Sequence, residues 1–101
     1  MAINFVRTDL NLGSVAGTSR YLSIVTTPAT QIVLGSASQA MTIFNIGSGT
    51  LIWGDSSIAV NSGNNLFVQS RVEWLNLQDG WSIYVRAESV ATLISVTEYR
   101  V

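Results

Sequence analysis

Apolar and β-branched residues recur along most of the chain in short runs, such as Tyr21–Thr27, Gln31–Leu34 and Leu66–Val68. In the later run Trp81–Ala87 the apolar residues also follow a period of two, at Trp81, Ile83, Val85 and Ala87. A period of two is that of a β-strand, because successive side chains of a strand point to opposite faces. Turn residues interrupt the runs about every 8–12 residues, and no segment has the 3.6-residue period of a helix. The pattern therefore predicts an all-β chain that forms a small antiparallel β-sandwich or jelly-roll-like barrel.

Met41–Gly54 contains two such runs on either side of a short glycine turn. Met41–Ile46 and Leu51–Trp53 flank Gly47–Gly49, and Gly54 ends the second run. Two β-rich runs separated by a few glycine-containing residues indicate a β-hairpin. We therefore predict that these two runs pair with each other.

A second hairpin is predicted around Asp79-Gly80, a residue pair preferred in two-residue type I′ turns. The flanking runs are Val72–Gln78 and Trp81–Ala87. In the register that this turn imposes, Glu73 lies opposite Arg86 as an oppositely charged cross-strand pair. The period of two then separates a core face, made of Val72, Trp74, Trp81, Ile83, Val85 and Ala87, from a second face with Leu75, Leu77 and Tyr84.

The second face of this hairpin is still half apolar, and the last segment of the chain repeats the feature. In Ala91–Val101, Ile94 and Val96 alternate with Leu93, Tyr99 and Val101. Strands that are apolar on both faces are covered on both sides or lie at an interface. Since no helix is predicted to cover the second face, we expect it to contact other subunits through Leu75, Tyr84, Leu93 and Tyr99.

The chain of 101 residues is predicted to form one domain with an irregular start. Residues 21–101 form the expected β-sandwich domain, and residues 1–20 form a loose N-terminal arm or irregular segment. Two interpretations of this segment stay open: a frayed terminus, or an extended arm that docks Ile3 and Phe5 on a neighbouring subunit.

Composition favours a protein whose surface is covered in an assembly. Charged residues make up only 11% of the chain, there is no lysine, and the net charge is −1. Such a surface is weakly hydrated and weakly self-repelling. The charge balance argues against nucleic acid as a partner, and the lack of a long apolar run argues against a membrane span. The first residues lack the features of a signal peptide, so we expect the protein to be made and kept in a cytoplasm.

The residue types present offer little chemistry. Without cysteine or histidine, thiolate and imidazole catalysis and most transition-metal sites are excluded, and we expect no enzyme activity, metal or cofactor. Glu88 and Glu98 would have to converge to act as a glycosidase pair. Asp55 belongs to a loop with too few carboxylates for calcium. We expect the tryptophans to pack in the core or at an interface. The alternative is that Trp53 and Asp55 form a platform that binds a sugar.

Several short motifs between Met41 and Glu98 resemble those of small all-β proteins of tailed-bacteriophage particles. The motifs are Asn45-Ile46-Gly47, Leu51-Ile52-Trp53-Gly54, Gly80-Trp81-Ser82-Ile83-Tyr84-Val85 and Val96-Thr97-Glu98. The resemblance covers about the last sixty residues. It implies a capsid decoration (cement) protein or a part of a head or tail fibre, and it implies no catalytic residues.

Together these features lead us to expect a structural virion protein on the capsid surface. It would bind the major capsid protein and copies of itself, as a trimer or a dimer, and stabilise the shell by bridging subunits. The alternative is a carbohydrate- or receptor-binding module of a head or tail fibre, and the exposure of Trp53 separates the two.

Overall fold

The computed structural model describes residues 16–35, 38–59 and 62–100 of the chain. This part is all-β: it contains strands and turns, and no helix. The strands are β2 (Ala16–Ile24), β3 (Thr30–Val33), β4 (Ala40–Asn45), β5 (Leu51–Gly54), β6 (Asn64–Leu66), β7 (Arg71–Trp74), β8 (Ser82–Ala87) and β9 (Thr92–Arg100).

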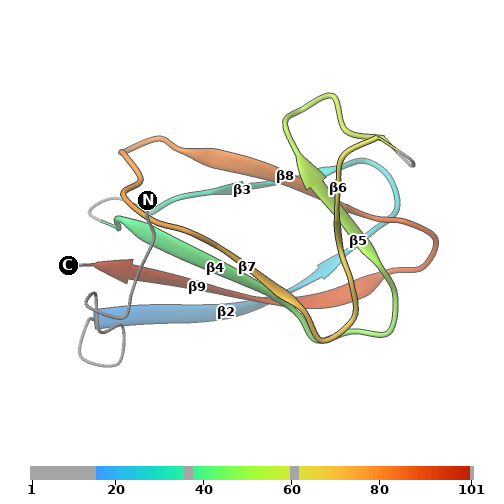
Figure 1. Cartoon of the computed structure of the whole chain (residues 1–101), viewed down its shortest axis with the longest axis horizontal. Coiled ribbons are helices and arrows are strands. Elements are labelled where there is room, and N and C mark those ends of the chain that lie inside the picture. The colour runs from blue at the N-terminus through green and yellow to red at the C-terminus, as the bar shows by residue number, and fades with distance from the viewer. Residues whose placement is uncertain (1–15, 36–37, 60–61, 101) are drawn as a thin grey trace.

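The strands form two antiparallel four-stranded sheets that pack face to face (Figure 1). Sheet I has the order β2-β9-β4-β7, and sheet II has the order β3-β8-β5-β6. A small antiparallel β-sandwich was predicted from the sequence, and this prediction is confirmed.

The strand pairs are nested around the β5–β6 connection. Strand β5 pairs with β6, β4 with β7, β3 with β8 and β2 with β9. The chain is therefore one long hairpin wound into a barrel, and the winding adds the pairs β4–β9 and β5–β8. This order is that of a jelly roll.

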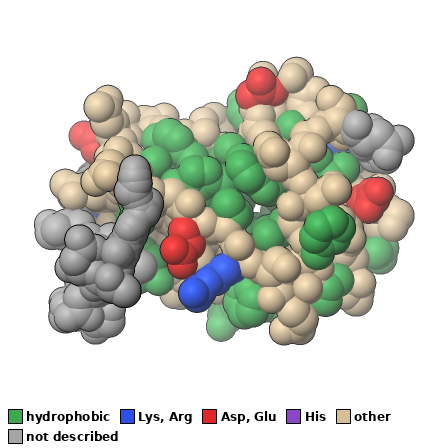
Figure 2. Space-filling view, viewed as in Figure 1, with side chains coloured by type: hydrophobic (Ala, Val, Ile, Leu, Met, Phe, Trp, Pro, Cys, Tyr) green, Lys and Arg blue, Asp and Glu red, His purple; other side chains and the backbone are tan. Residues whose placement is uncertain are grey.

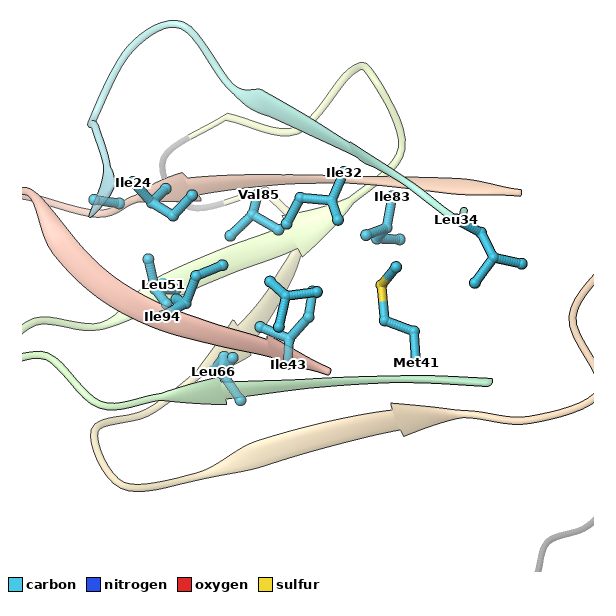
Figure 3. Close-up of a cluster of buried hydrophobic side chains, with 12 residues drawn as sticks. Ile24, Ile32, Leu34, Met41, Ile43, Leu51, Leu66, Ile83, Val85 and Ile94 are labelled. Carbon is cyan, nitrogen blue, oxygen red and sulfur yellow. The ribbon is translucent and has the colours of Figure 1, made fainter. Parts of the chain in front are cut away.

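The core lies between the sheets and is almost entirely aliphatic. Each strand contributes the side chains of alternate residues, so the inward positions of both sheets interdigitate. Figure 3 shows ten of the buried residues: Ile24, Ile32, Leu34, Met41, Ile43, Leu51, Leu66, Ile83, Val85 and Ile94.

The first described strand begins earlier than the predicted run Tyr21–Thr27. Strand β2 starts at Ala16, and the small residues Gly17–Ser19 lie opposite Tyr99, Glu98 and Thr97 of β9. Residues 16–20 are therefore part of sheet I rather than of an irregular arm. Pairing with a long neighbouring strand outweighs the weak strand propensity of these residues.

The predicted hairpin of Met41–Gly54 is wrong. Strand β4 belongs to sheet I and β5 to sheet II, so Ile46–Thr50 carries the chain from one sheet to the other. The side chain of Asn45 fixes this crossover, because its Nδ2 donates to the carbonyl oxygen of Gly49 at 2.8 Å and its Oδ1 accepts from the amide of Gly47 at 3.0 Å.

The predicted hairpin around Asp79-Gly80 is also wrong, although the turn exists. The amide of Trp81 donates to the carbonyl of Gln78 at 3.1 Å, and Gly80 has a φ of 86°. However, β7 pairs with β4 in sheet I, and β8 pairs with β3 and β5 in sheet II. The proposed pair of Glu73 with Arg86 is therefore absent, and Glu73 lies beside Arg71 instead, 3.5 Å from its Nε.

The prediction of which residues face the core agrees with the structure better than the prediction of which strands pair. Every residue predicted for the core face between Val72 and Ala87 is buried or packs against the core. Leu77 is an exception to the second face, because it too packs against the core. The preceding Asn76 has a φ of 58°, a left-handed conformation that interrupts the strand alternation and turns Leu77 inward.

Candidate interaction surfaces

The outer face of sheet I has no charged residue on its two central strands, β9 and β4. On β9 the outward positions follow from the alternation, since the intervening residues are buried, and on β4 they follow from its register with β9, although Ala40 and Thr42 are themselves only 2% and 9% exposed. On the two central strands these positions are Leu93, Ser95, Thr97 and Tyr99 of β9, and Ala40, Thr42 and Phe44 of β4. All seven are uncharged, and the Arg71–Glu73 pair lies on the edge strand β7.

Hydroxyl and aromatic groups alternate across this face near β2. Tyr21 is 69% exposed, and Leu93, opposite Ser23 in the register, is 42% exposed. The hydroxyls of Ser19 and Thr97 are 2.9 Å apart and share a hydrogen bond. The face is thus apolar in its large side chains and hydroxyl-bearing in its small ones.

The outer face of sheet II is partly covered by the chain itself. Ile52 points outward beside Arg86, yet it is only 2% exposed. The backbone of Gly63 lies on it, because a Cβ at Gly63 would be 2.4 Å from Cγ2 of Ile52 and 3.2 Å from Cγ2 of Ile58. The β5–β6 connection therefore packs on sheet II and leaves less of that face for a partner.

The residues predicted for an interface do not form one surface. Leu93 and Tyr99 lie together on the outer face of sheet I. Tyr84 lies on the outer face of sheet II, opposite Gln31 and Gly54, and Leu75 follows the end of β7. Ile3 and Phe5 lie outside the described residues.

The three tryptophans form one cluster at the side of the sandwich. The ring centroids of Trp53 and Trp74 are 5.2 Å apart with the planes at 89°, and those of Trp74 and Trp81 are 5.1 Å apart with the planes at 51°. All three rings are partly buried and pack against the core. Figure 2 shows hydrophobic side chains gathered in the middle of this side of the molecule, with an acidic and a basic side chain next to each other below them.

Asp55, the second residue of the predicted ligand platform, is a turn residue. One carboxylate oxygen accepts hydrogen bonds from the backbone amide of Ser57 at 2.9 Å and from the hydroxyl of Ser57 at 2.5 Å. These bonds, the hydroxyl bond first, hold the pKa of Asp55 below its ordinary value. Trp53 packs against the core, whereas the carboxylate of Asp55 accepts hydrogen bonds within its own turn. The two side chains therefore do not act together as a ligand platform.

The two candidate glycosidase carboxylates do not converge. The backbone of Glu88 pairs with Thr50 at the end of the sandwich where β4 crosses to β5. Glu98 lies at the other end of β9, where its Oε1 accepts the amide of Gly35 at 2.6 Å and its Oε2 is paired with Arg20. Each end of the sandwich therefore holds one of the two carboxylates.

Glu98 is a buried ionic group that links sheet I to the β3–β4 connection. Its side chain is 7% exposed, and it reaches from β9 to Arg20 of β2 and to the connection between β3 and β4. Burial raises the pKa of Glu98, but hydrogen bonds from Arg20, Gly35 and Ser38 and the charge of Arg20 outweigh it, so the pKa lies below the ordinary value. These contacts stabilise the ionised carboxylate, and its role in the structure is to hold the neighbouring segments together.

Asn45 is a second buried polar group that sequence reasoning missed. It is fully buried, and its Nδ2 donates to Gly49 in the crossover and, at 3.0 Å, to the carbonyl of Leu66 in β6. The available signal was its position, because Met41, Ile43 and Asn45 alternate on the inward side of β4. A polar residue that continues an inward apolar series is expected to be hydrogen-bonded.

Searches for a metal site, a membrane span and a known family gave no positive finding for the described residues or, in the case of the family, for the sequence. In the described residues, no group of three or more acidic, histidine or cysteine side chains has the arrangement of a metal site. The same part of the chain contains no helix long and apolar enough to cross a membrane. Comparisons with protein families and with curated protein sequences find no match to this chain.

Proposed function

We propose that this protein is a structural component of a phage particle that binds the capsid and stabilises it without catalysis. The observation that carries the proposal is the uncharged outer face of sheet I, with Tyr21 and Leu93 exposed on it. Protein interfaces are depleted of charge and enriched in aromatic residues at their centre, as this face is. The motifs between Met41 and Glu98 that resemble those of phage particle proteins favour a capsid as the partner.

Binding would act through burial of apolar surface. Full burial of an exposed leucine side chain contributes roughly 1.5–3 kcal/mol, and covering the 42% of Leu93 that is exposed would contribute a corresponding fraction of this. The hydroxyl groups of Ser19, Ser95 and Thr97 would offer hydrogen bonds between the apolar contacts. A clamp of this kind holds neighbouring capsid subunits together by contact alone.

The proposal predicts that Leu93→Asp weakens binding to the capsid. The purified protein is added to particles that lack it, and co-sedimentation of the two is measured. A carboxylate at this position would be buried without a partner in the complex, so binding should fall by at least roughly tenfold. Phe67→Asp is the matched control, since Phe67 is 58% exposed in the connection between β6 and β7 and should tolerate the charge.

Two results would contradict the capsid proposal. One is the absence of this chain from particles purified out of the cells that express it. The other is equal co-sedimentation of wild-type and Leu93→Asp protein, which would place the contact on another surface.

The alternative function, glycan or receptor binding at Trp53 and Asp55, is supported by the partial exposure of the tryptophan cluster. The edge-to-face contact of Trp53 with Trp74 opposes it, because a sugar needs an open aromatic face. On a glycan array we therefore expect no glycan whose binding depends on Trp53. Binding by the wild type that Trp53→Ala removes and Phe67→Ala preserves, with both variants folded, would establish the alternative instead.

A further inference from the structure

We propose that Asp79-Gly80 is a modification site, at which the aspartate converts spontaneously into isoaspartate and becomes a substrate for isoaspartyl methyltransferases. The pair lies in the turn 78–81, within the connection that carries the chain from β7 in sheet I to β8 in sheet II. The proposal concerns a covalent change of this chain alone, so it does not rest on the capsid function proposed above.

The conversion needs water and no other reagent. The backbone nitrogen of Gly80 attacks Cγ of the neutral carboxyl group of Asp79. A C–N bond forms, and one carboxyl oxygen leaves as water with the amide proton and the carboxyl proton, which produces a five-membered succinimide ring. Water then opens the ring at either carbonyl. Attack at Cγ restores aspartate, whereas attack at the main-chain carbonyl gives isoaspartate, whose peptide chain continues through Cβ and Cγ.

The residue after the aspartate decides how readily the ring forms. Glycine has no side chain to hinder its own nitrogen, and it leaves the backbone free to rotate. The three aspartates of the chain are followed by Leu10, Ser56 and Gly80, and no asparagine is followed by glycine. The turn itself requires the glycine, because residue 80 has a φ of 86°, a conformation that other residues rarely adopt. The fold therefore needs the most reactive pair in the chain.

The structure leaves the reacting groups of this pair open. Asp79 and Gly80 are both exposed. Among the described residues, the Asp79 carboxylate has no ion-pair or hydrogen-bond partner and the Gly80 amide donates no backbone hydrogen bond. A Cβ built at Gly80 would have no heavy atom within 4 Å beyond its chain neighbours. The backbone thus has the space to rotate until the nitrogen meets Cγ.

Asp55 is an aspartate of the same molecule that the structure protects. It is also exposed, but one of its carboxylate oxygens accepts hydrogen bonds from the amide and the hydroxyl of Ser57, at 2.9 Å and 2.5 Å. These bonds fix the carboxylate, and by lowering the pKa of Asp55 they deplete the neutral form that cyclises. We therefore expect isoaspartate at position 79 and little at position 55.

The modification changes a segment that contacts the core. Trp81 follows Gly80 directly, and its ring centroid lies 5.1 Å from that of Trp74. The amide of Trp81 also closes the turn by donating to the carbonyl of Gln78 at 3.1 Å. An additional carbon in the main chain at residue 79 disrupts this turn and shifts Trp81 relative to Trp74. We therefore expect tryptophan fluorescence to change as isoaspartate accumulates.

Ageing of the purified full-length protein in warm neutral buffer tests the proposal. Samples taken over several weeks are digested, and the peptides are labelled by an isoaspartyl methyltransferase with methyl groups from S-adenosylmethionine. We expect the label on the peptide that contains residue 79 to rise with time. Asp79→Glu is the matched control, because it keeps the charge but would need a six-membered ring, which forms far more slowly, so the label on this peptide should be lost.

The same ageing in urea shows what the fold contributes. The unfolded chain gives a reference rate for each aspartate. Folding should leave the rate at Asp79 nearly unchanged, and it should lower the rate at Asp55, where the hydrogen bonds from Ser57 are present only in the folded protein.

Absence of isoaspartate at position 79 of the folded protein overturns the proposal, whether or not the unfolded chain forms it. Label that persists on the same peptide in Asp79→Glu does so too, because it would come from another residue. A rate at Asp79 that folding strongly lowers would show that the turn is held against rotation. None of these measurements involves a particle, so their outcome is independent of capsid binding, which is measured with Leu93→Asp.

Discussion

Replacing Asn45 by alanine should lower the free energy of unfolding by about 3 kcal/mol or more. The substitution leaves the carbonyls of Gly49 and Leu66 and the amide of Gly47 without their partner in a buried site. Each such group left unsatisfied costs about 1–3 kcal/mol, less where water enters the space. Denaturant unfolding followed by tryptophan fluorescence measures the change.

Two further variants separate lost hydrogen bonds from lost volume at this position. Asn45→Asp keeps the shape but places a carboxylate against two carbonyl oxygens, so we expect at least as large a loss at neutral pH and a smaller one in acid, where the side chain regains a proton to donate. Asn65→Ala, at an exposed position of β6, should change stability by less than about 0.5 kcal/mol. A loss in Asn45→Ala no larger than in Asn65→Ala would refute the assigned role.

Glu98→Gln should lower the free energy of unfolding by roughly 2–3 kcal/mol at neutral pH. Arg20 loses its charged partner, and the amide of Gly35 loses a charged acceptor, in a site where the carboxylate is 7% exposed. Breaking a fully buried ion pair costs about 3–5 kcal/mol, and the 38% exposure of the Arg20 side chain reduces this. Thermal and urea unfolding of the two proteins measure the difference.

The pH dependence of this difference has a definite sign. The pKa of Glu98 is lower in the folded protein than its ordinary value of 4.5. The stabilisation by the carboxylate is therefore complete above pH 4.5 and is lost as the pH falls through the lowered folded-state pKa. We expect the stability of the wild type to approach that of Glu98→Gln as the pH falls below 4.5. A gap that stays constant over this range would show that the charge is not what stabilises the site.

The sequence predicted which residues are inside, and it failed on which strands pair. Val72, Ile83 and Val85 were assigned to the core by alternation alone, because the pleat depends only on local geometry. A turn such as Asp79-Gly80 looks the same whether its flanking strands pair or separate into two sheets. That choice is made by partners distant in sequence, such as Met41 for Trp74 and Ile32 for Ile83.

The sequence indicated single residues that point outward, but not which of them lie on the same surface. Leu93 and Tyr99 were recognised as outward apolar residues, and the structure brings them to one face. Tyr84 has the same local pattern but lies on the opposite sheet, because β8 and β9 belong to different layers. The links made by Asn45 and Glu98 join residues from separate strands, so a linear pattern contains no signal for their partners.

The nested strand pairs also determine where the polypeptide enters and leaves the domain. Ala16 and Arg100 are partners in the outermost pair, so segments joined before one and after the other emerge side by side. The innermost connection, Asp55–Gly63, is the farthest point of the winding from both. Linking the two ends and opening the chain in that connection would therefore place β6–β9 before β2–β5 in the sequence, with the direction of every strand unchanged. We expect such a circular permutant to keep the same strand pairs, because the pairs are nested around the point of opening.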